Sequence, residues 1–145
     1  SRRLMVSAWA PHELDEMALP PCHYAFQINI NNGVMDLMWQ QRSADVFLGL
    51  PYDITMYGLL LEMLAKGAGL KAGQLIGQLG DCHLYNNHLE QAKTFLRRPR
   101  RALPSLMLDS GIYLNEFLYI PEANEIKLIN YNPLPAIKAA LSVGK

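Results

Sequence analysis

Cysteine and charged residues are scarce in this 145-residue chain. Two cysteines are too few for a disulfide framework, and no Cys-x-x-Cys pair offers the spacing of a structural zinc site. Charged residues make up 18% of the chain, and 13 basic side chains balance 13 acidic ones. A net charge of zero argues against a general nucleic-acid coat or a membrane-surface patch.

Long apolar runs, internal repeats and low-complexity segments are also missing. No run approaches the ~18 residues that a membrane-spanning helix needs, and no charged-then-apolar leader opens the chain. Half of the residues are hydrophobic, so we expect one globular domain over residues 1–145. The limited polar surface favours an obligate oligomer. Ser1-Arg2-Arg3 leads straight into the apolar segment that starts at Leu4, which predicts a fragment or a processed chain.

The hydrophobic pattern predicts six strands and two helices. We expect the strands at residues 4–9, 24–31, 34–41, 73–79, 103–108 and 126–131, and the helices at 54–66 and 87–97, with a helical turn at 12–17. Strands first paired in a hairpin and then separated by helices indicate an α/β (α+β) fold, with a mixed sheet flanked by helices.

Two local signals support these assignments. Asn31-Asn32-Gly33 is typical of a hairpin turn. In the first helix the spacing of the apolar residues predicts one buried face, and Gly67 and Gly69 supply the stop. The residues predicted for that face are Ile54, Tyr57, Leu61 and Leu64.

Cys22 is the candidate nucleophile, because it follows two rigid prolines and precedes His23. A thiolate forms at neutral pH only beside a base or a positive charge. Adjacent residues of a strand point to opposite faces, so His23 is not obviously that base. The alternative is a buried structural cysteine, and for Cys82 a small core residue is the favoured interpretation.

Arginines provide the candidate anion site. Gln41-Arg42-Ser43 places a guanidinium beside a hydroxyl at a strand end, which suits a phosphate group. Arg2 and Arg3 are further candidates, and a weak surface ion pair is the alternative for each arginine. A second basic cluster is interpreted as a solvated turn rather than a nucleic-acid site. It consists of Arg97, Arg98, Arg100 and Arg101.

Two further positions attract attention. His83 and Tyr85 share one face of an extended segment and could both bond one ligand hydroxyl. His83 and His88 lack the helical spacing and the third ligand of a metal site, so no metal is predicted. Asp53 precedes the predicted helix, where it is either an N-cap or a carboxylate aimed into a cleft.

Taken together, these segments resemble the C-terminal portion of the thymidylate synthase family, which includes the deoxycytidylate hydroxymethylases. The matching segments are residues 1–9, 17–23, 41–51, 80–88 and 131–138. Several long motifs in the same order are a specific signal. The resemblance implies a cytoplasmic homodimer that packs sheet to sheet and uses 5,10-methylenetetrahydrofolate as co-substrate, without a metal.

The resemblance implies roles for individual residues. Cys22 would add to C6 of a pyrimidine ring, His23 would belong to the active-site water network, and Asp53 would face the base; these three are the candidate catalytic residues. Arg42 and Ser43 would bind the phosphate of the nucleotide, and Arg2 and Arg3 would bind the phosphate in the neighbouring subunit. Gln41 and Asp45 would contact the base, and His83 and Tyr85 would bind the ribose 3′-hydroxyl. The folate would pack at Leu48, Gly49 and Tyr52.

The chain departs from the family pattern in three ways. A further N-terminal region of the family, with a phosphate arginine, a tryptophan and a glutamate, has no counterpart, so we expect the second half of a subunit. The family commonly ends in an apolar tail that closes over the folate, whereas this chain ends in Gly144-Lys145. Third, Asp53 stands where members that use dUMP have asparagine.

The third departure has a physical consequence for base recognition. An asparagine amide can donate to O4 of uracil and accept from N3, whereas an ionised carboxylate only accepts. A carboxylate can accept from the N4 amino group of cytosine, and pairing with N3 as well requires one added proton. Unpaired polar groups in a closed site can reject a substrate by ~10⁴–10⁵-fold. Asp53 therefore predicts a cytosine nucleotide.

The predicted reaction is the transfer of a one-carbon unit to C5 of a pyrimidine nucleoside monophosphate, with hydroxymethylation of dCMP favoured. A methyl product stays open, as does the choice between ribose and deoxyribose. The alternatives are a thymidylate synthase that converts dUMP to dTMP, and an inactive nucleotide-binding fragment.

Overall fold

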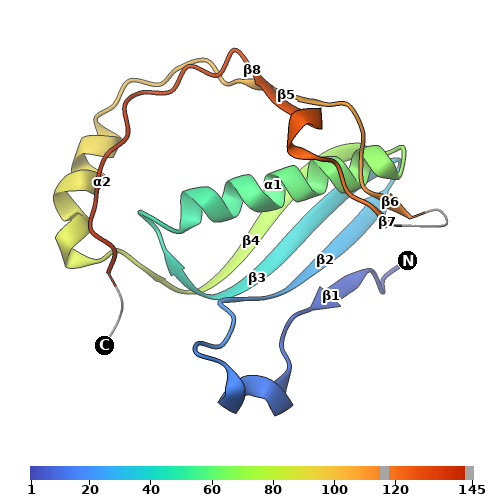
Figure 1. Cartoon of the computed structure of the whole chain (residues 1–145), viewed down its shortest axis with the longest axis horizontal. Helices are drawn as coiled ribbons and strands as arrows, with labels where there is room; N and C mark the ends of the chain where they lie inside the picture. The colour runs from blue at the N-terminus through green and yellow to red at the C-terminus, as the bar shows by residue number, and fades with distance from the viewer. Residues whose placement is uncertain (115–117, 143–145) are drawn as a thin grey trace.

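A four-stranded sheet carries one long helix across one of its faces (Figure 1). The computed structural model describes residues 1–114 and 118–142. The strands lie in the order β1 (Met5–Ser7), β2 (His23–Asn31), β3 (Val34–Asp45) and β4 (Lys71–His83). β1 and β3 pair antiparallel with β2, and β4 runs parallel to β3. Helix α1 (Leu50–Gly67) connects the two parallel strands. The expected mixed sheet with flanking helices is confirmed.

The predicted hairpin turn between β2 and β3 is also confirmed. Asn31 pairs with Val34 across the turn. Asn32 and Gly33 have φ angles of 49° and 77°. Positive φ at both central residues gives a turn whose twist matches that of the two strands.

The core lies between α1 and the sheet. Along β3 alternate side chains are buried, and Leu37 is fully so. Leu61 and Tyr57 of α1 pack against them, and the Tyr57 ring stacks on Trp39 with centroids 5.1 Å apart and planes at 13°. Ile54, predicted to share this face, is instead 48% exposed, because the buried stripe of α1 runs through residues 57, 61 and 65.

The main elements are longer than predicted. α1 begins at Leu50 rather than at residue 54, with Pro51 in its first turn. A proline is tolerated there because backbone N–H groups of the first turn have no partner within the helix, so the missing N–H costs no helical hydrogen bond. β3 continues to Asp45 and β4 to His83, beyond their apolar stretches. Polar residues at these strand ends hid the extensions, because a period-two apolar pattern stops where the site begins.

The second half of the chain forms smaller elements outside the main sheet. α2 (Leu89–Leu96) follows a 3₁₀ turn at Asn86–His88. Among the described residues, β5 (Ser105–Leu108) and β8 (Ile126–Ile129) pair only with each other. The short pair β6 (Tyr113–Leu114) and β7 (Leu118–Tyr119) was not predicted. Two further 3₁₀ turns lie at Pro11–Glu16 and Ala123–Glu125. No helix within residues 1–114 and 118–142 is long and apolar enough to cross a membrane.

Gly77 of β4 leaves the space that the Trp39 indole occupies. A Cβ at this position would lie 2.5 Å from two ring carbons of Trp39. We predict that Gly77→Ala lowers the free energy of unfolding by about 1–3 kcal/mol, because the stacked indole cannot move aside without strain. Urea unfolding measures the effect.

Gly58→Ala in α1 is the matched control. A Cβ there would meet only a Leu75 methyl group at 3.8 Å, an ordinary contact. We expect this control to stabilise the chain by about 0.5–1 kcal/mol, because alanine is the better helix former. Equal effects of the two substitutions would contradict the close fit at Gly77.

Candidate active site

Most candidate residues gather where the start of β2, the ends of β3 and β4 and the start of α1 meet. His23 pairs with Gln41 across β2 and β3, and Asp45 pairs with His83 across β3 and β4. The carboxyl ends of parallel strands are a frequent place for ligand sites in α/β proteins. The topology thus brings together residues that lie up to sixty positions apart in the sequence.

Cys22 is an exposed free thiol at this edge, so the alternative of a buried structural cysteine is wrong. Its carbonyl oxygen accepts a hydrogen bond from the Arg42 backbone N–H at 2.9 Å. The Arg42 guanidinium donates to the carbonyl oxygens of Pro21 and Pro20, at 3.1 and 2.8 Å. Arg42 therefore fastens the segment that presents the thiol. A guanidinium has more N–H donors than these two contacts use, so it can still face an anion.

Asp53 points from α1 toward the sheet, with 14% of its side chain exposed. Its Oδ1 lies 3.2 Å from Nε2 of His23, and its Oδ2 accepts a hydrogen bond from Nε2 of Gln41 at 3.0 Å. The N-cap interpretation is wrong, because Gly49 is the N-cap and makes no side-chain cap. The signal for a site position was available: Asp53 precedes Tyr57 by four residues, on the same side of α1.

His23 and Tyr57 stack beside this carboxylate, with ring centroids 5.5 Å apart. Nδ1 of His23 is buried and has no partner among the residues that the structure describes. Burial, and then the nearby charge of Asp53, raises the pKa of the Tyr57 phenol above 10.0. The sequence analysis placed Tyr57 on the core face and missed its contact with the site.

The proposed folate and base residues surround the start of α1. Asp45 accepts hydrogen bonds at Oδ1 from the backbone N–H groups of Phe47 and Leu48, at 3.0 and 3.3 Å. It thereby shapes the turn that leads into the helix. A Cβ at Gly49 would lie 3.0 Å from the Asp45 carbonyl oxygen. Tyr52, 77% exposed, stands on the first turn of the helix.

His83 and Tyr85 lie side by side, as their alternation predicted. Their ring centroids are 5.0 Å apart, and Nδ1 of His83 lies 3.3 Å from the Asp81 carbonyl oxygen. Tyr85 also contacts His88, which is fully buried and whose Nε2 lies 2.7 Å from the carbonyl oxygen of Ala140. His88 thus ties the C-terminal segment to this edge, a role that the sequence analysis missed. Gly144-Lys145 lies outside the described residues.

No group of three or more metal-ligating side chains occurs in the part of the chain that the structure describes. Ser43 lies at the strand end, opposite Asp81, and is half-buried. Cys82 is exposed, so its interpretation as a core residue is wrong.

Arg2 and Arg3 lie away from the site of their own chain. Both are exposed and precede Met5, which pairs with Gln27 of β2. Gln27 is five residues from Cys22, which is roughly 16 Å along an extended strand. The fold of a single chain therefore does not bring these arginines to Cys22.

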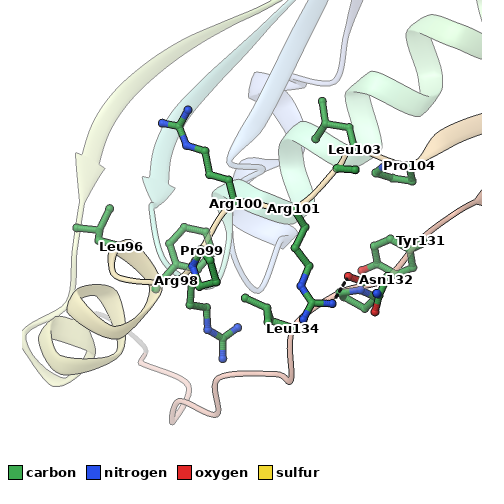
Figure 2. Close-up of a pocket in the computed structure, with 13 residues that line it drawn as sticks. Leu96, Arg98, Pro99, Arg100, Arg101, Leu103, Pro104, Tyr131, Asn132 and Leu134 are labelled. Atoms are coloured by element: carbon green, nitrogen blue, oxygen red, sulfur yellow. Dashed lines mark hydrogen bonds between the residues drawn. The ribbon is translucent and has the colours of Figure 1, made fainter.

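A cavity of about 600 Å³ lies elsewhere, between the segment after α2 and the segment after β8 (Figure 2). These two segments run side by side in Figure 1, and the Arg101 guanidinium donates to the Asn132 carbonyl oxygen at 3.1 Å. Figure 2 shows Arg98 and Arg100 extending in different directions from the cavity wall. None of the candidate site residues lines it.

Comparisons with known proteins identify one family. A sequence model of thymidylate synthase matches residues 1–143. A protein named thymidylate synthase from Coxiella burnetii is 48% identical over 143 residues, which are 99% of this chain and 53% of the relative. One from Listeria innocua is 49% identical over 144 residues, 99% of this chain and 45% of the relative. The chain spans about half the length of the curated relatives it matches.

The Tyr57 phenol gives a direct test of the electrostatics at Asp53. Its raised pKa has burial as the first cause and the Asp53 charge as the second. In the Asp53→Asn variant we expect the Tyr57 pKa to fall but to stay above 10.0, because burial remains. Absorbance titration of tyrosinate, with Tyr57→Phe identifying the signal among the seven tyrosines, measures it. An unchanged pKa would show that the two side chains are not in electrostatic contact.

Proposed function

The chain belongs to the thymidylate synthase family, and from this premise we propose that its protein transfers a one-carbon unit from 5,10-methylenetetrahydrofolate to C5 of a pyrimidine nucleoside monophosphate. The observation that carries the proposal is the arrangement at one sheet edge: an exposed thiol on a segment fastened by Arg42, beside the paired His23 and Asp53. We also propose that the enzyme is cytoplasmic.

Cys22 is the nucleophile of the proposed reaction. Its thiolate adds to C6 of the ring, and the electron pair of the C5–C6 double bond moves toward C5. C5 then attacks the methylene carbon, and one of its two bonds to folate nitrogen breaks. Loss of the C5 proton breaks the second C–N bond, so that tetrahydrofolate leaves with the electron pair and a C5=CH2 group stays on the Cys22 adduct. Either hydride from the tetrahydrofolate, which becomes dihydrofolate, or the oxygen of a water molecule, which releases a proton, adds to this CH2 carbon. The C5–C6 double bond re-forms as the Cys22 thiolate departs.

Two nucleotides are candidates for the substrate. The names of the relatives favour dUMP and the synthesis of thymidylate. Asp53 favours dCMP, because an ionised carboxylate accepts a hydrogen bond from the N4 amino group and cannot donate to O4 of uracil. One oxygen of Asp53 lies 3.2 Å from Nε2 of His23, and the other accepts a hydrogen bond from Nε2 of Gln41 at 3.0 Å.

The proposed substrate contacts follow the grouping at the site. Arg42 and Ser43 bind the phosphate, His83 and Tyr85 bind the ribose hydroxyl, and Asp45 and Asp53, beside Gln41, contact the base. Leu48, Gly49 and Tyr52 form the floor for the folate at the start of α1.

A homodimer completes the proposed site. On the sheet face opposite α1, Met5 is 65% exposed and Ile76 is 37% exposed, and the Oε1 atom of Gln40 is buried without a partner in the described part of the chain. A second copy packed on this face would cover Met5 and Ile76, and its Arg2 and Arg3 would reach the phosphate of the neighbouring site.

The base preference is tested by Asp53→Asn in the full-length protein that contains this chain. We predict that the ratio of kcat/KM for dCMP to that for dUMP falls by at least about tenfold, because the amide can donate to O4. The phosphate contacts serve both nucleotides, so the affinity for each should change less. A ratio that stays constant would mean that Asp53 does not face the base.

The shared site is tested by mixing inactive variants. Cys22→Ser removes the nucleophile and Arg3→Ala removes a phosphate contact, so each should lose most of its turnover alone. A one-to-one mixture should regain up to about a quarter of the wild-type activity, because about half of its dimers are mixed and one of the two sites in a mixed dimer holds an intact Cys22 and an intact Arg3. Mixing Cys22→Ser with Arg42→Ala, which lies beside Cys22 in the same subunit, is the control. No recovery with Arg3→Ala would overturn the cross-subunit contact.

A further inference from the structure

Every hydrogen-bonding group of the Gln41 side chain is used inside the protein. Its Oε1 accepts from the indole Nε1 of Trp39 at 3.1 Å. Its Nε2 donates to the Ser43 carbonyl oxygen at 2.9 Å and to Oδ2 of Asp53 at 3.0 Å. Only 4% of Gln41 is exposed. A glutamine amide has two N–H donors, and both are occupied, so Gln41 has no donor left for a nucleotide.

The orientation of this amide is fixed from two sides. An indole N–H only donates, and a backbone carbonyl only accepts, so Oε1 must face Trp39 and Nε2 must face Ser43. Trp39 is itself held in place, 4% exposed, by the stacked Tyr57 ring and by the missing Cβ of Gly77. Gln41 therefore presents an N–H, and not an oxygen, to Asp53.

We propose that Gln41, anchored by Trp39, is a positioning residue that aims the Asp53 carboxylate at the base, rather than a residue that binds the base itself. The relay Trp39–Gln41–Asp53 makes residue 53 an acceptor with a fixed direction, so the base preference depends on a tryptophan that touches no substrate. The link to base preference depends on the proposed function, whereas the relay itself does not.

A mutant cycle tests the relay without any substrate. The single variants Trp39→Phe and Asp53→Asn and the double variant are compared by urea unfolding. Trp39→Phe removes the N–H donor and retains a ring to stack on Tyr57. We expect the two sites to be coupled by at least about threefold in the unfolding equilibrium constant, as in other hydrogen-bonded networks.

Repeating the cycle in a Gln41→Met background shows whether Gln41 transmits the coupling between residues 39 and 53. Tyr57 stacks on Trp39 and is in electrostatic contact with Asp53, so it is the competing route for coupling. If Gln41 transmits the coupling, the coupling between residues 39 and 53 vanishes in this background. It should persist with Gln40→Met, the neighbouring glutamine on the opposite face of β3. No coupling in the wild-type background, or full coupling without Gln41, would overturn the relay.

Nucleotide binding connects the relay to specificity. In the full-length protein, titration with dCMP and dUMP should show that Gln41→Met reduces the discrimination between them by at least about threefold, while Gln40→Met leaves it unchanged. If Gln41→Met instead weakens the binding of both nucleotides equally, Gln41 has only a structural role and the positioning role is overturned. If the wild type binds neither nucleotide, the proposed function fails, and the unfolding cycles still decide whether the relay exists.

Discussion

The stacking of Tyr57 on Trp39 is the contact on which the site depends. It holds α1 against β3 through two large aromatic rings, a pair worth about 0.5–1.5 kcal/mol beyond the buried area. One turn before Tyr57 the same helix carries Asp53, so fixing the ring also fixes the carboxylate over Gln41. The shape of the core and the position of the charged group are thus decided by one interaction.

Polar groups at buried positions fix the orientation of the side chains in the site. Gln41 occupies a position of β3 at which the alternation calls for an apolar side chain, and Asp53 does the same on α1. Leaving such groups unpaired would cost about 1–3 kcal/mol each, so each has taken a partner of the matching kind. Donor-only and acceptor-only partners at the ends of the chain of bonds leave one arrangement for the amide between them.

The candidate site residues of this chain lie in two separate parts of the main sheet. Cys22, Arg42 and Asp53 lie at one edge, where strand ends and a helix start converge. Arg2 and Arg3 lie away from that edge, because β1 runs antiparallel to β2 and the residues before Met5 continue past Gln27, away from Cys22. The fold of this chain therefore keeps these arginines away from Cys22.

The sequence by itself determined the local elements and the residue types of the site. The period-two pattern around Asn32-Gly33, the long apolar helix and the polar strand ends predicted most of the main sheet and most of the side chains that gather at its edge. Local rules succeed here because turns, strand alternation and helix stops depend on neighbours along the chain.

Tertiary structure alone decided which of these side chains meet. Local rules offered an N-cap as one interpretation of Asp53, and it is wrong because the Gln41 amide and the His23 ring, from two different strands, lie against the carboxylate instead. The same holds for Trp39, whose indole N–H has no visible role in the sequence, and for His88, which binds a carbonyl 52 residues later. Such partners are fixed by packing between segments that are far apart in the sequence. A local sequence pattern does not contain that information.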